Sequence, residues 1–180
     1  ALPGRGGRRL RWRGGGGGAG AVGGLVRGGI GGGGVGCDEA LAISRGRLHY
    51  TSHARMPEGL GGWSWDLMSR VLRRDLQIIE KINRRHEQEH PDRPESTRII
   101  DHGEIRMGNL AFVGSCKVNG VSALHTDLMK RTVFKDLHAL HPERIVNVTN
   151  GVTPRRWLNT RNGRLRDLLS DTGGDRWIPA

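Results

Sequence analysis

Cysteine is scarce in this sequence of 180 residues, because Cys37 and Cys116 are its two cysteines. Two thiols are too few for a disulfide framework or for a zinc site built from four thiolates. Long hydrophobic runs are missing as well, since no apolar stretch approaches the ~20 residues that span a bilayer. These shortages exclude a disulfide-rich secreted domain and an integral membrane protein, and they predict a reduced, cytoplasmic setting.

Acidic residues are absent from the first fifth of the chain. Residues 1–36 contain 18 of the 30 glycines, six arginines and no aspartate or glutamate. Glycine loses the most backbone entropy on folding and contributes no side chain to a core. We therefore predict that residues 1–36 are a low-complexity Gly/Arg-rich leader, disordered or spurious. The alternative is a non-enzymatic Arg/Gly-rich protein whose arm binds nucleic-acid phosphates, with Trp12 as its base-stacking side chain.

From Cys37 onward, short apolar strands alternate with amphipathic helices, which predicts an α/β fold. The expected elements are a helix over 38–48, a strand over 49–53, a long helix from Ser64 to about His90, a strand and a buried segment within 98–118, a turn at Asn119-Gly120, a helix from Ser122 to Pro142, a strand over 145–148 and a helix over 163–170. The apolar residues expected to form one buried stripe on the long helix are Trp65, Met68, Val71, Leu72, Ile79 and Ile82.

Residues 86–90 (HEQEH) fit the H-E-x-x-H pattern. On a helix this spacing presents two zinc ligands one turn apart, with a glutamate as general base. A catalytic zinc also needs a third protein ligand and a closed cavity. Charged residues flank the motif here, and Pro91 ends the helix directly after it. We therefore interpret this stretch as a solvated helix end and predict no metal site, with a HExxH zinc protease as the less favoured alternative.

Residues 150–157 (NGVTPRRW) hold the most informative chemistry. An Asn-Gly pair predicts a tight turn, and a Thr-Pro pair restricts the chain that leaves it. Arg155, Arg156 and Trp157 then combine two anion-binding guanidiniums with a flat aromatic wall. That combination suits an anionic ligand with a ring. The alternative is a structural turn whose arginines form surface ion pairs.

Several further motifs follow one another in order along the chain. They are residues 51–53 (TSH), 56–58 (MPE), 76–79 (LQII), 82–83 (IN), 106–110 (RMGNL), 119–125 (NGVSALH) and 149–158 (TNGVTPRRWL). In this order and at this spacing they resemble the α-glucan (glycogen, starch, maltodextrin) phosphorylases, and agreement runs nearly continuously from Cys37 to the last residue. The chain is therefore identified as a member of that family, in which the HExxH stretch falls on a variable helix end.

The resemblance implies a glycosyltransferase that cleaves a terminal α-1,4-linked glucose from glycogen or maltodextrin with inorganic phosphate and releases glucose 1-phosphate. It implies two Rossmann-like domains of the GT-B type with a deep cleft between them, and a homodimer. The implied cofactor is pyridoxal 5′-phosphate, bound as a Schiff base to a lysine. The implied partners are an α-1,4-glucan and inorganic phosphate, in the cytoplasm, with no membrane and no nucleic acid.

Carried over residue by residue, the resemblance assigns substrate contacts to His53, Val121 and Asn150. His53 matches a histidine that contacts the glucosyl unit being transferred, and Asn150 matches an asparagine that hydrogen-bonds the same sugar. Val121 lines the apolar side of that sugar. His125 falls on a histidine close behind these contacts, and we expect it to position them.

The resemblance also implies cofactor contacts. Trp157 corresponds to an aromatic residue beside the cofactor ring, and Arg155 and Arg156 lie nearby in the sequence. The family's Schiff-base lysine and phosphate-binding Lys/Arg cluster have no match in these residues. We therefore expect no complete catalytic set here, and no phosphorolysis from this polypeptide alone.

The family's domain junction falls after Asn150. Residues 37–150 are then expected to be the end of the N-terminal sugar-binding domain, and residues 151–180 the truncated start of the C-terminal cofactor domain. Ser52 and Ala54 depart from the family, which has an asparagine and a threonine on either side of the site histidine.

Overall fold

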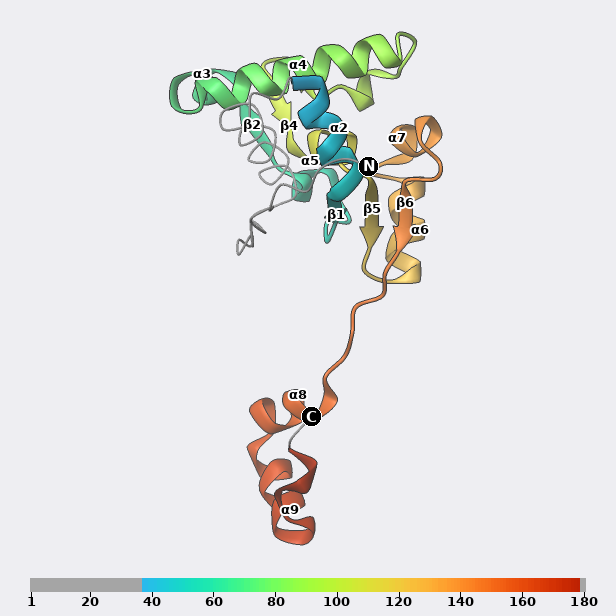
Figure 1. The fold of residues 1–180 in the computed structure, drawn as a ribbon. Coiled ribbons are helices and arrows are strands. Elements are labelled where there is room, and N and C mark those ends of the chain that lie inside the picture. Colours follow the sequence, from blue (N-terminus) through green and yellow to red (C-terminus); the bar gives the residue numbers. More distant parts are fainter. Residues whose placement is uncertain (1–36, 179–180) are drawn as a thin grey trace, which may run out of the picture. The chain divides into compact units, whose positions relative to one another are not determined.

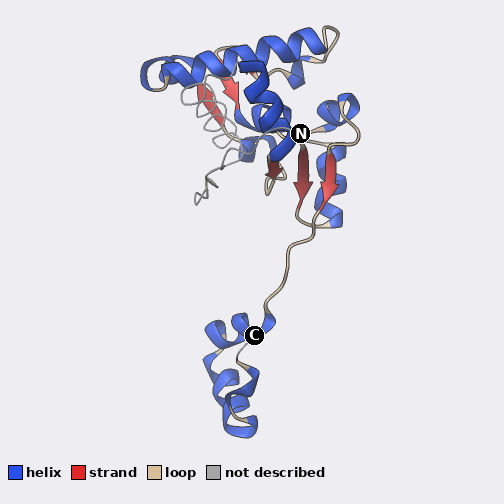
Figure 2. Cartoon of the chain, viewed as in Figure 1, coloured by secondary structure: helices blue, strands red, loops and turns tan. Residues whose placement is uncertain are grey.

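The computed structural model describes residues 37–178, so the predicted leader over residues 1–36 lies outside them. The chain divides into two compact units, one ending at Val148 and the other beginning at Thr149. Within the described residues, every strand belongs to the first unit (Figure 2). The division lies close to the junction expected after Asn150, and the assignment of either unit to a particular domain stays a prediction.

A three-stranded parallel sheet forms the centre of the first unit. Its strands are β1 (His49–Thr51), β5 (Lys117–Gly120) and β6 (Ile145–Asn147), in the order β1-β5-β6. In the pairing, Tyr50 lies opposite Val118, and Val118 lies opposite Ile145. Parallel neighbours need crossover connections, which helical segments supply here. The structure therefore confirms the predicted α/β class and the strands expected near residues 49 and 145.

Several helices belong to the first unit, and one of them lies beside β5 and β6 (Figure 1). They are α2 (Cys37–Arg47), α4 (Arg73–Glu89), α5 (Met107–Gly114), α6 (Ala123–Arg131) and α7 (Lys135–Leu140). Helices α2, α4 and α5 contact one another, while α6 packs against β5 and β6. Residues 108–114 of α5 are all buried, which explains why Asn109 is the one polar side chain of this helix.

Aromatic rings at the centre of the core join the sheet to the helices. Phe112 of α5 and Phe134, which precedes α7, are 0% and 1% exposed. Their ring centroids are 5.4 Å apart, and the ring of Tyr50 in β1 meets Phe134 edge-on at 6.4 Å. Aromatic pairs at these separations add to the free energy gained by burial. This cluster therefore connects β1, α5 and the start of α7.

A second, antiparallel sheet lies in the first unit, in the order β2-β4-β3. It consists of β2 (Gly62–Ser64), β3 (Ile100–Asp101) and β4 (Glu104–Arg106), and the 3-10 helices η1 (Pro57–Leu60) and η2 (Glu95–Thr97) precede β2 and β3. His102 and Gly103 join β3 to β4 with φ angles of 47° and 76°. Two residues with positive φ make the hairpin turn that matches the twist of paired strands.

The long helix predicted from Ser64 to His90 is two helices. Ser64 caps α3 (Trp65–Val71), as predicted, by accepting a hydrogen bond from the Leu67 amide at 3.4 Å. The chain leaves the helical conformation at Leu72 (φ −129°, ψ 49°), and α4 (Arg73–Glu89) begins at the next residue. Because α3 stays beside β2 while α4 contacts α2 and α5, the two helices do not share one buried stripe. The predicted burial of Trp65, Val71 and Leu72 is therefore wrong, whereas Met68, Ile79 and Ile82 are buried.

Two expectations near residue 120 also differ from the structure. Asn119 and Gly120 form the end of β5 and not a turn. Ser122 caps the next helix, as predicted, but the helix expected to run to Pro142 is interrupted between Arg131 and Lys135. The interruption buries Phe134 in the core, so a tertiary contact outweighs local helix propensity there.

The second unit consists of α8 (Pro154–Arg161), α9 (Gly163–Gly173) and the 3-10 helix η3 (Asp175–Trp177). Helix α9 covers the helix predicted over 163–170, and Asn162 caps it by accepting from the Leu165 amide at 3.1 Å. Helix α8 was not predicted, and no turn forms at Asn150-Gly151. Over the described residues, no helix combines the length and apolar character needed to span a membrane.

Candidate functional site

A cavity of about 290 Å³ opens beyond the carboxyl ends of β1 and β5. Its lining residues are His53, Arg55, Val121, Ser122, Leu124, His125 and Leu128. In α/β folds, ligands bind outside the carboxyl ends of parallel strands, because the loops that follow the strands converge there. The structure thus brings His53, Val121 and His125 together at a place where this fold class binds ligands.

His125 connects the two strand ends through both nitrogens of its ring. Its Nδ1 lies 3.2 Å from the Val121 amide nitrogen, and its Nε2 lies 3.0 Å from the Ala54 carbonyl oxygen. An amide only donates, so Nδ1 accepts, and Nε2 must carry the proton that it donates to Ala54. The ring is 6% exposed and is therefore held in one tautomer and one orientation. This arrangement ties the segment after β1 to the segment after β5.

Further hydrogen bonds hold these segments in place. The Ser52 amide donates to the Asn119 carbonyl at 3.0 Å, which extends the pairing of β1 with β5 by one residue. The Thr51 hydroxyl donates to Asn119 Oδ1 at 2.8 Å. At the start of α6, the Ser122 hydroxyl accepts from the His125 amide at 3.2 Å, which fixes the turn of helix that carries the ring. The positions of His53 and Val121 therefore depend on backbone and side-chain hydrogen bonds in the segments next to them.

The wall of the cavity combines polar and apolar chemistry. His53 and Arg55 are exposed at the opening, while Leu124 and Leu128 of α6 add apolar surface beside Val121. Small-molecule sites commonly pair a mainly apolar wall with a few polar groups. The sequence had indicated His53, Val121 and His125 but not Arg55 or the two leucines. Their proximity along the chain to His53 and His125 was the available signal.

The remaining predicted site residues belong to the second unit. Asn150 precedes α8, and Arg155, Arg156 and Trp157 follow Pro154 in the first turn of that helix. All four side chains are exposed, and Trp157 is 52% exposed. Two guanidiniums and an indole at a helix N-terminus form a surface that favours an anion.

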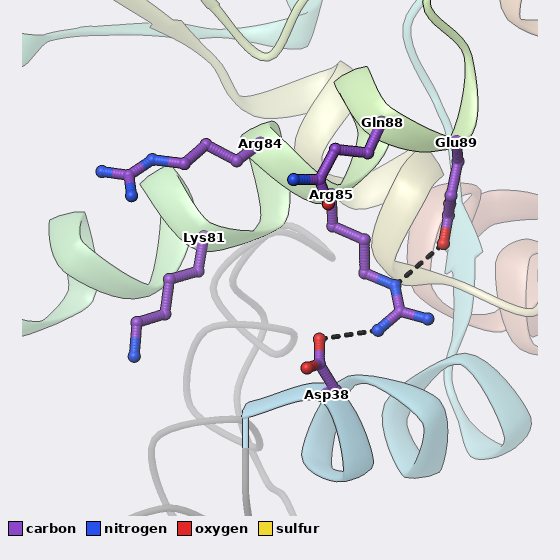
Figure 3. A pocket seen from close by; sticks show the side chains of 6 residues that line it. All are labelled: Asp38, Lys81, Arg84, Arg85, Gln88 and Glu89. Atoms are coloured by element: carbon purple, nitrogen blue, oxygen red, sulfur yellow. Dashed lines mark hydrogen bonds and ion pairs between the residues drawn. The ribbon is translucent and has the colours of Figure 1, made fainter.

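A larger cavity of about 640 Å³ lies between α2 and α4 (Figure 3). Charged groups line it, and Arg85 occupies its centre, where it donates to Asp38 at 2.6 Å and to Glu89 at 2.8 Å. Arg45 of α2 also donates to Glu89, at 3.2 Å. These contacts join α2 to α4, so the side chains serve to hold the helices together.

Replacing Glu89 with glutamine is expected to lower the free energy of unfolding by about 1 kcal/mol at pH 7. Burial acts to raise the pKa of Glu89, but hydrogen bonds from Arg85 and Arg45 outweigh it and lower the pKa from 4.5 to about 2. The stabilisation is therefore complete above about pH 4.5 and is lost as the pH falls toward 2.

Urea unfolding of the wild type and Glu89→Gln at pH 7 and pH 3 measures this effect. The difference between the two chains should shrink at pH 3, where Glu89 of the unfolded wild type is protonated. Glu39→Gln, at an exposed position of α2, is the matched control and should change little. A Glu89→Gln effect of the same size at both pH values would contradict the role of this carboxylate.

The HExxH stretch ends α4 without the arrangement of a protease. Glu87, the residue that would act as general base, accepts hydrogen bonds from Asn83 at 3.1 Å and from Arg93 at 2.7 Å. Burial, with a smaller contribution from the charge of Arg93, lowers the pKa of His86 to about 4. The His86 ring is therefore neutral at pH 7, and the carboxylate of Glu87 already accepts hydrogen bonds from Asn83 and Arg93.

Comparison with known proteins decides the family. A family model described as carbohydrate phosphorylase matches residues 21–180. The chain belongs to the carbohydrate phosphorylase family. This confirms the resemblance noted from the sequence motifs, and the comparisons give no support to a nucleic-acid-binding protein or to a zinc protease. The match begins within the predicted leader, whose structure lies outside the described residues.

Curated phosphorylases from distant organisms align with most of this chain. Glycogen phosphorylase of Chlamydia pneumoniae is 44% identical over 151 residues, which cover 78% of this chain and 18% of the relative. Glycogen phosphorylase of Synechocystis is 45% identical over 149 residues, covering 77% and 18%. Cytosolic alpha-glucan phosphorylase 2 of Arabidopsis thaliana is 38% identical over 157 residues, covering 81% and 19%. This phosphorylase chain thus spans about a fifth of the length of these relatives.

Proposed function

We propose that this chain provides the glucose-binding wall of an α-1,4-glucan phosphorylase, which transfers a terminal glucosyl unit of glycogen or maltodextrin to inorganic phosphate. The observation that carries the proposal is the cavity at the carboxyl ends of β1 and β5, where His53, Val121 and His125 meet. Relatives named glycogen phosphorylase, at 44% and 45% identity, support the choice of reaction. The product is glucose 1-phosphate.

Each side chain has a distinct part in this proposal. His53, exposed at the opening, hydrogen-bonds the glucosyl unit, and the role of Asn150 as a contact to sugar hydroxyls stays a prediction from the motif resemblance. Val121 lies against the apolar face of the ring. His125 acts as a positioning residue, because its two hydrogen bonds hold the backbone on either side of the cavity in place. Arg55 adds a guanidinium that can donate hydrogen bonds to sugar hydroxyls.

Transfer to phosphate requires that water be kept from the reacting sugar carbon, since water would compete as the acceptor. Leu124 and Leu128 widen the apolar wall beside Val121 and leave less polar surface for water to bind. The chain's contribution is therefore to orient the glucose and exclude solvent. The groups that move protons and hold phosphate are proposed to lie elsewhere in the enzyme, so the 180 residues alone are expected to release no glucose 1-phosphate.

The fold supports a placement of both units within the enzyme. The parallel sheet β1-β5-β6 with its helices is consistent with residues 37–150 as the end of a Rossmann-like, GT-B-type sugar-binding domain. The separate unit from Thr149 is consistent with residues 151–180 as the start of the cofactor domain. A cytoplasmic homodimer is part of the same proposal.

The exposed first turn of α8 suits part of a pyridoxal 5′-phosphate site. Arg155 and Arg156 offer guanidiniums to an anion, and Trp157 offers a flat surface to a ring. When bound, the cofactor supplies a phosphate group that relays a proton to the substrate phosphate. Residues 149–180 contain no lysine, so this segment contributes contacts to the cofactor and not the Schiff base.

A chimera tests the proposal. Residues 49–157 of this chain replace the matching segment of glycogen phosphorylase from Chlamydia pneumoniae, and release of glucose 1-phosphate from maltodextrin and phosphate is measured. The chimera should be active, and His53→Ala in it should lower kcat/KM by about 10- to 100-fold, the loss expected for one strong hydrogen bond. His125→Ala should have a similar effect through displacement of the cavity wall.

His49→Ala is the matched control, because His49 is an exposed histidine of β1 that lies four residues before His53 and does not line the cavity. Its kcat/KM should stay near that of the unsubstituted chimera. An inactive chimera, or one in which His53→Ala and His49→Ala have equal effects, would contradict the proposed role of this wall.

A further inference from the structure

His86 is a buried polar side chain without a partner in its surroundings. It lies in the last turn of α4 and is 0% exposed. Neither of its ring nitrogens has a hydrogen-bond partner among the described residues. Buried polar groups are nearly always satisfied, and an exception in a folded protein needs an explanation. A ligand that accepts the lone pair of the imidazole would provide one.

Two other histidines converge on this ring from different elements. His90 ends α4 one turn after His86, and His141 follows the end of α7. The centroids of His86 and His90 are 5.4 Å apart, and those of His90 and His141 are 4.8 Å apart. One ring nitrogen from each of the three lies within 4.8 Å of the others. The third ligand that the HExxH pattern lacks in sequence is thus supplied by a residue far along the chain.

We propose that His86, His90 and His141 form a binding site for a divalent transition-metal ion of the Zn²⁺ type. Zinc takes neutral imidazole nitrogens at about 2.0–2.1 Å in a tetrahedral arrangement, with solvent as the fourth ligand where three come from the protein. Ligand nitrogens in such a site are about 3.3 Å apart, so small side-chain rotations would bring the three rings from their present positions onto one ion.

The surroundings of the cluster suit a bound ion on one side of the core. Phe112 lies beside His141, with ring centroids 6.2 Å apart, and provides an apolar wall. Arg93 and Arg144 are nearby cations. The charge of Arg93 is balanced by Glu87 at 2.7 Å, and Arg144 lies 3.8 Å from Glu143. Because Glu87 is held by Arg93 and Asn83, it is not available to activate a metal-bound water. The ion would therefore join the end of α4 to the end of α7 and would not hydrolyse peptides.

The metal site and the proposed glucose site are separate. None of the three histidines is among the residues that line the cavity at His53. Either proposal can therefore fail without affecting the other.

Titration of the purified 180-residue chain with Zn²⁺, in competition with a chromophoric chelator, tests the site. One equivalent should bind, and His141→Asn and His90→Gln should each weaken binding by about 100-fold. His102→Gln is the control, since His102 is exposed and lies outside the cluster. It should bind like the wild type.

Co²⁺ substitution in the unsubstituted chain gives a second readout that does not depend on the variants folding. A four-coordinate site produces intense visible absorption, whereas hydrated or surface-bound Co²⁺ does not. The proposal would be overturned by a lack of stoichiometric binding, by a weak octahedral spectrum, or by equal affinity of His141→Asn and His102→Gln for Zn²⁺.

Discussion

Replacing Gly120 with alanine is expected to lower the free energy of unfolding by about 3 kcal/mol, at the upper end of the cost of overpacking. A methyl group at this position would meet the Thr126 hydroxyl and also its backbone, at 2.8 Å from Cα and 2.9 Å from the amide nitrogen. Backbone atoms cannot rotate away as a flexible side chain can. The substitution would therefore push α6 off the end of β5 and displace His125.

Urea unfolding followed by circular dichroism measures the loss of stability. Gly46→Ala is the matched control, because a methyl group at Gly46 of α2 meets no atom within 4 Å. Alanine also favours the helix, so this control is expected to be neutral or to stabilise the chain by about 0.5 kcal/mol. Equal effects of the two substitutions would show that the close approach of α6 to β5 is not what requires glycine at position 120.

Truncating Phe112 to alanine is expected to destabilise the chain by about 3–5 kcal/mol. The ring is 0% exposed and lies in α5, where it contacts the ring of Phe134 at 5.4 Å. Its removal takes away buried apolar surface and leaves a cavity that the surrounding helices and sheet cannot fully close. Because the free energy of unfolding of a marginally stable domain is little larger than this loss, much of the population should be unfolded at 37 °C.

The same unfolding measurement, with Phe112→Leu as the conservative variant, checks this expectation. Leucine keeps most of the volume and should cost about 1 kcal/mol. A second check is the near-ultraviolet circular dichroism of the wild type, which should disappear in Phe112→Ala. A loss for Phe112→Ala as small as that for Phe112→Leu would mean that the site collapses around the missing ring.

Local sequence signals were sufficient for elements that depend on a few neighbouring residues. The strands near residues 49 and 145, a helix predicted over 38–48 and observed as Cys37–Arg47, and the caps at Ser64 and Ser122 were all predicted and are observed. Each rests on alternation of apolar residues or on a side chain that bonds to an amide three positions away. Such interactions form within one segment and leave a readable pattern.

Breaks inside helices were not predictable in this way. The apolar spacing runs without interruption through Leu72, yet the helix breaks there, and α3 and α4 pack on different partners. Phe134 interrupts the second long helix because its ring is drawn into the core. The sequence predicts a turn at Gly120, whereas glycine is needed there because Thr126 of a neighbouring helix lies too close for a larger side chain.

The candidate site shows the same contrast between what local sequence signals indicate and what tertiary contacts decide. Motif resemblance pointed to His53, Val121 and His125, but it did not reveal that the two nitrogens of His125 connect Val121 with Ala54. His141 is 51 positions beyond His90, so no local pattern could pair them.

From the amino-acid sequence alone came the α/β class, membership of the phosphorylase family and the residues that its motifs mark. Only the folded chain decided which of those residues meet, which tautomer His125 adopts and that three histidines face one another. The physical reason is that propensity, capping and hydrophobic spacing act over a few residues. Contacts between distant segments instead depend on how whole helices and strands share one buried volume.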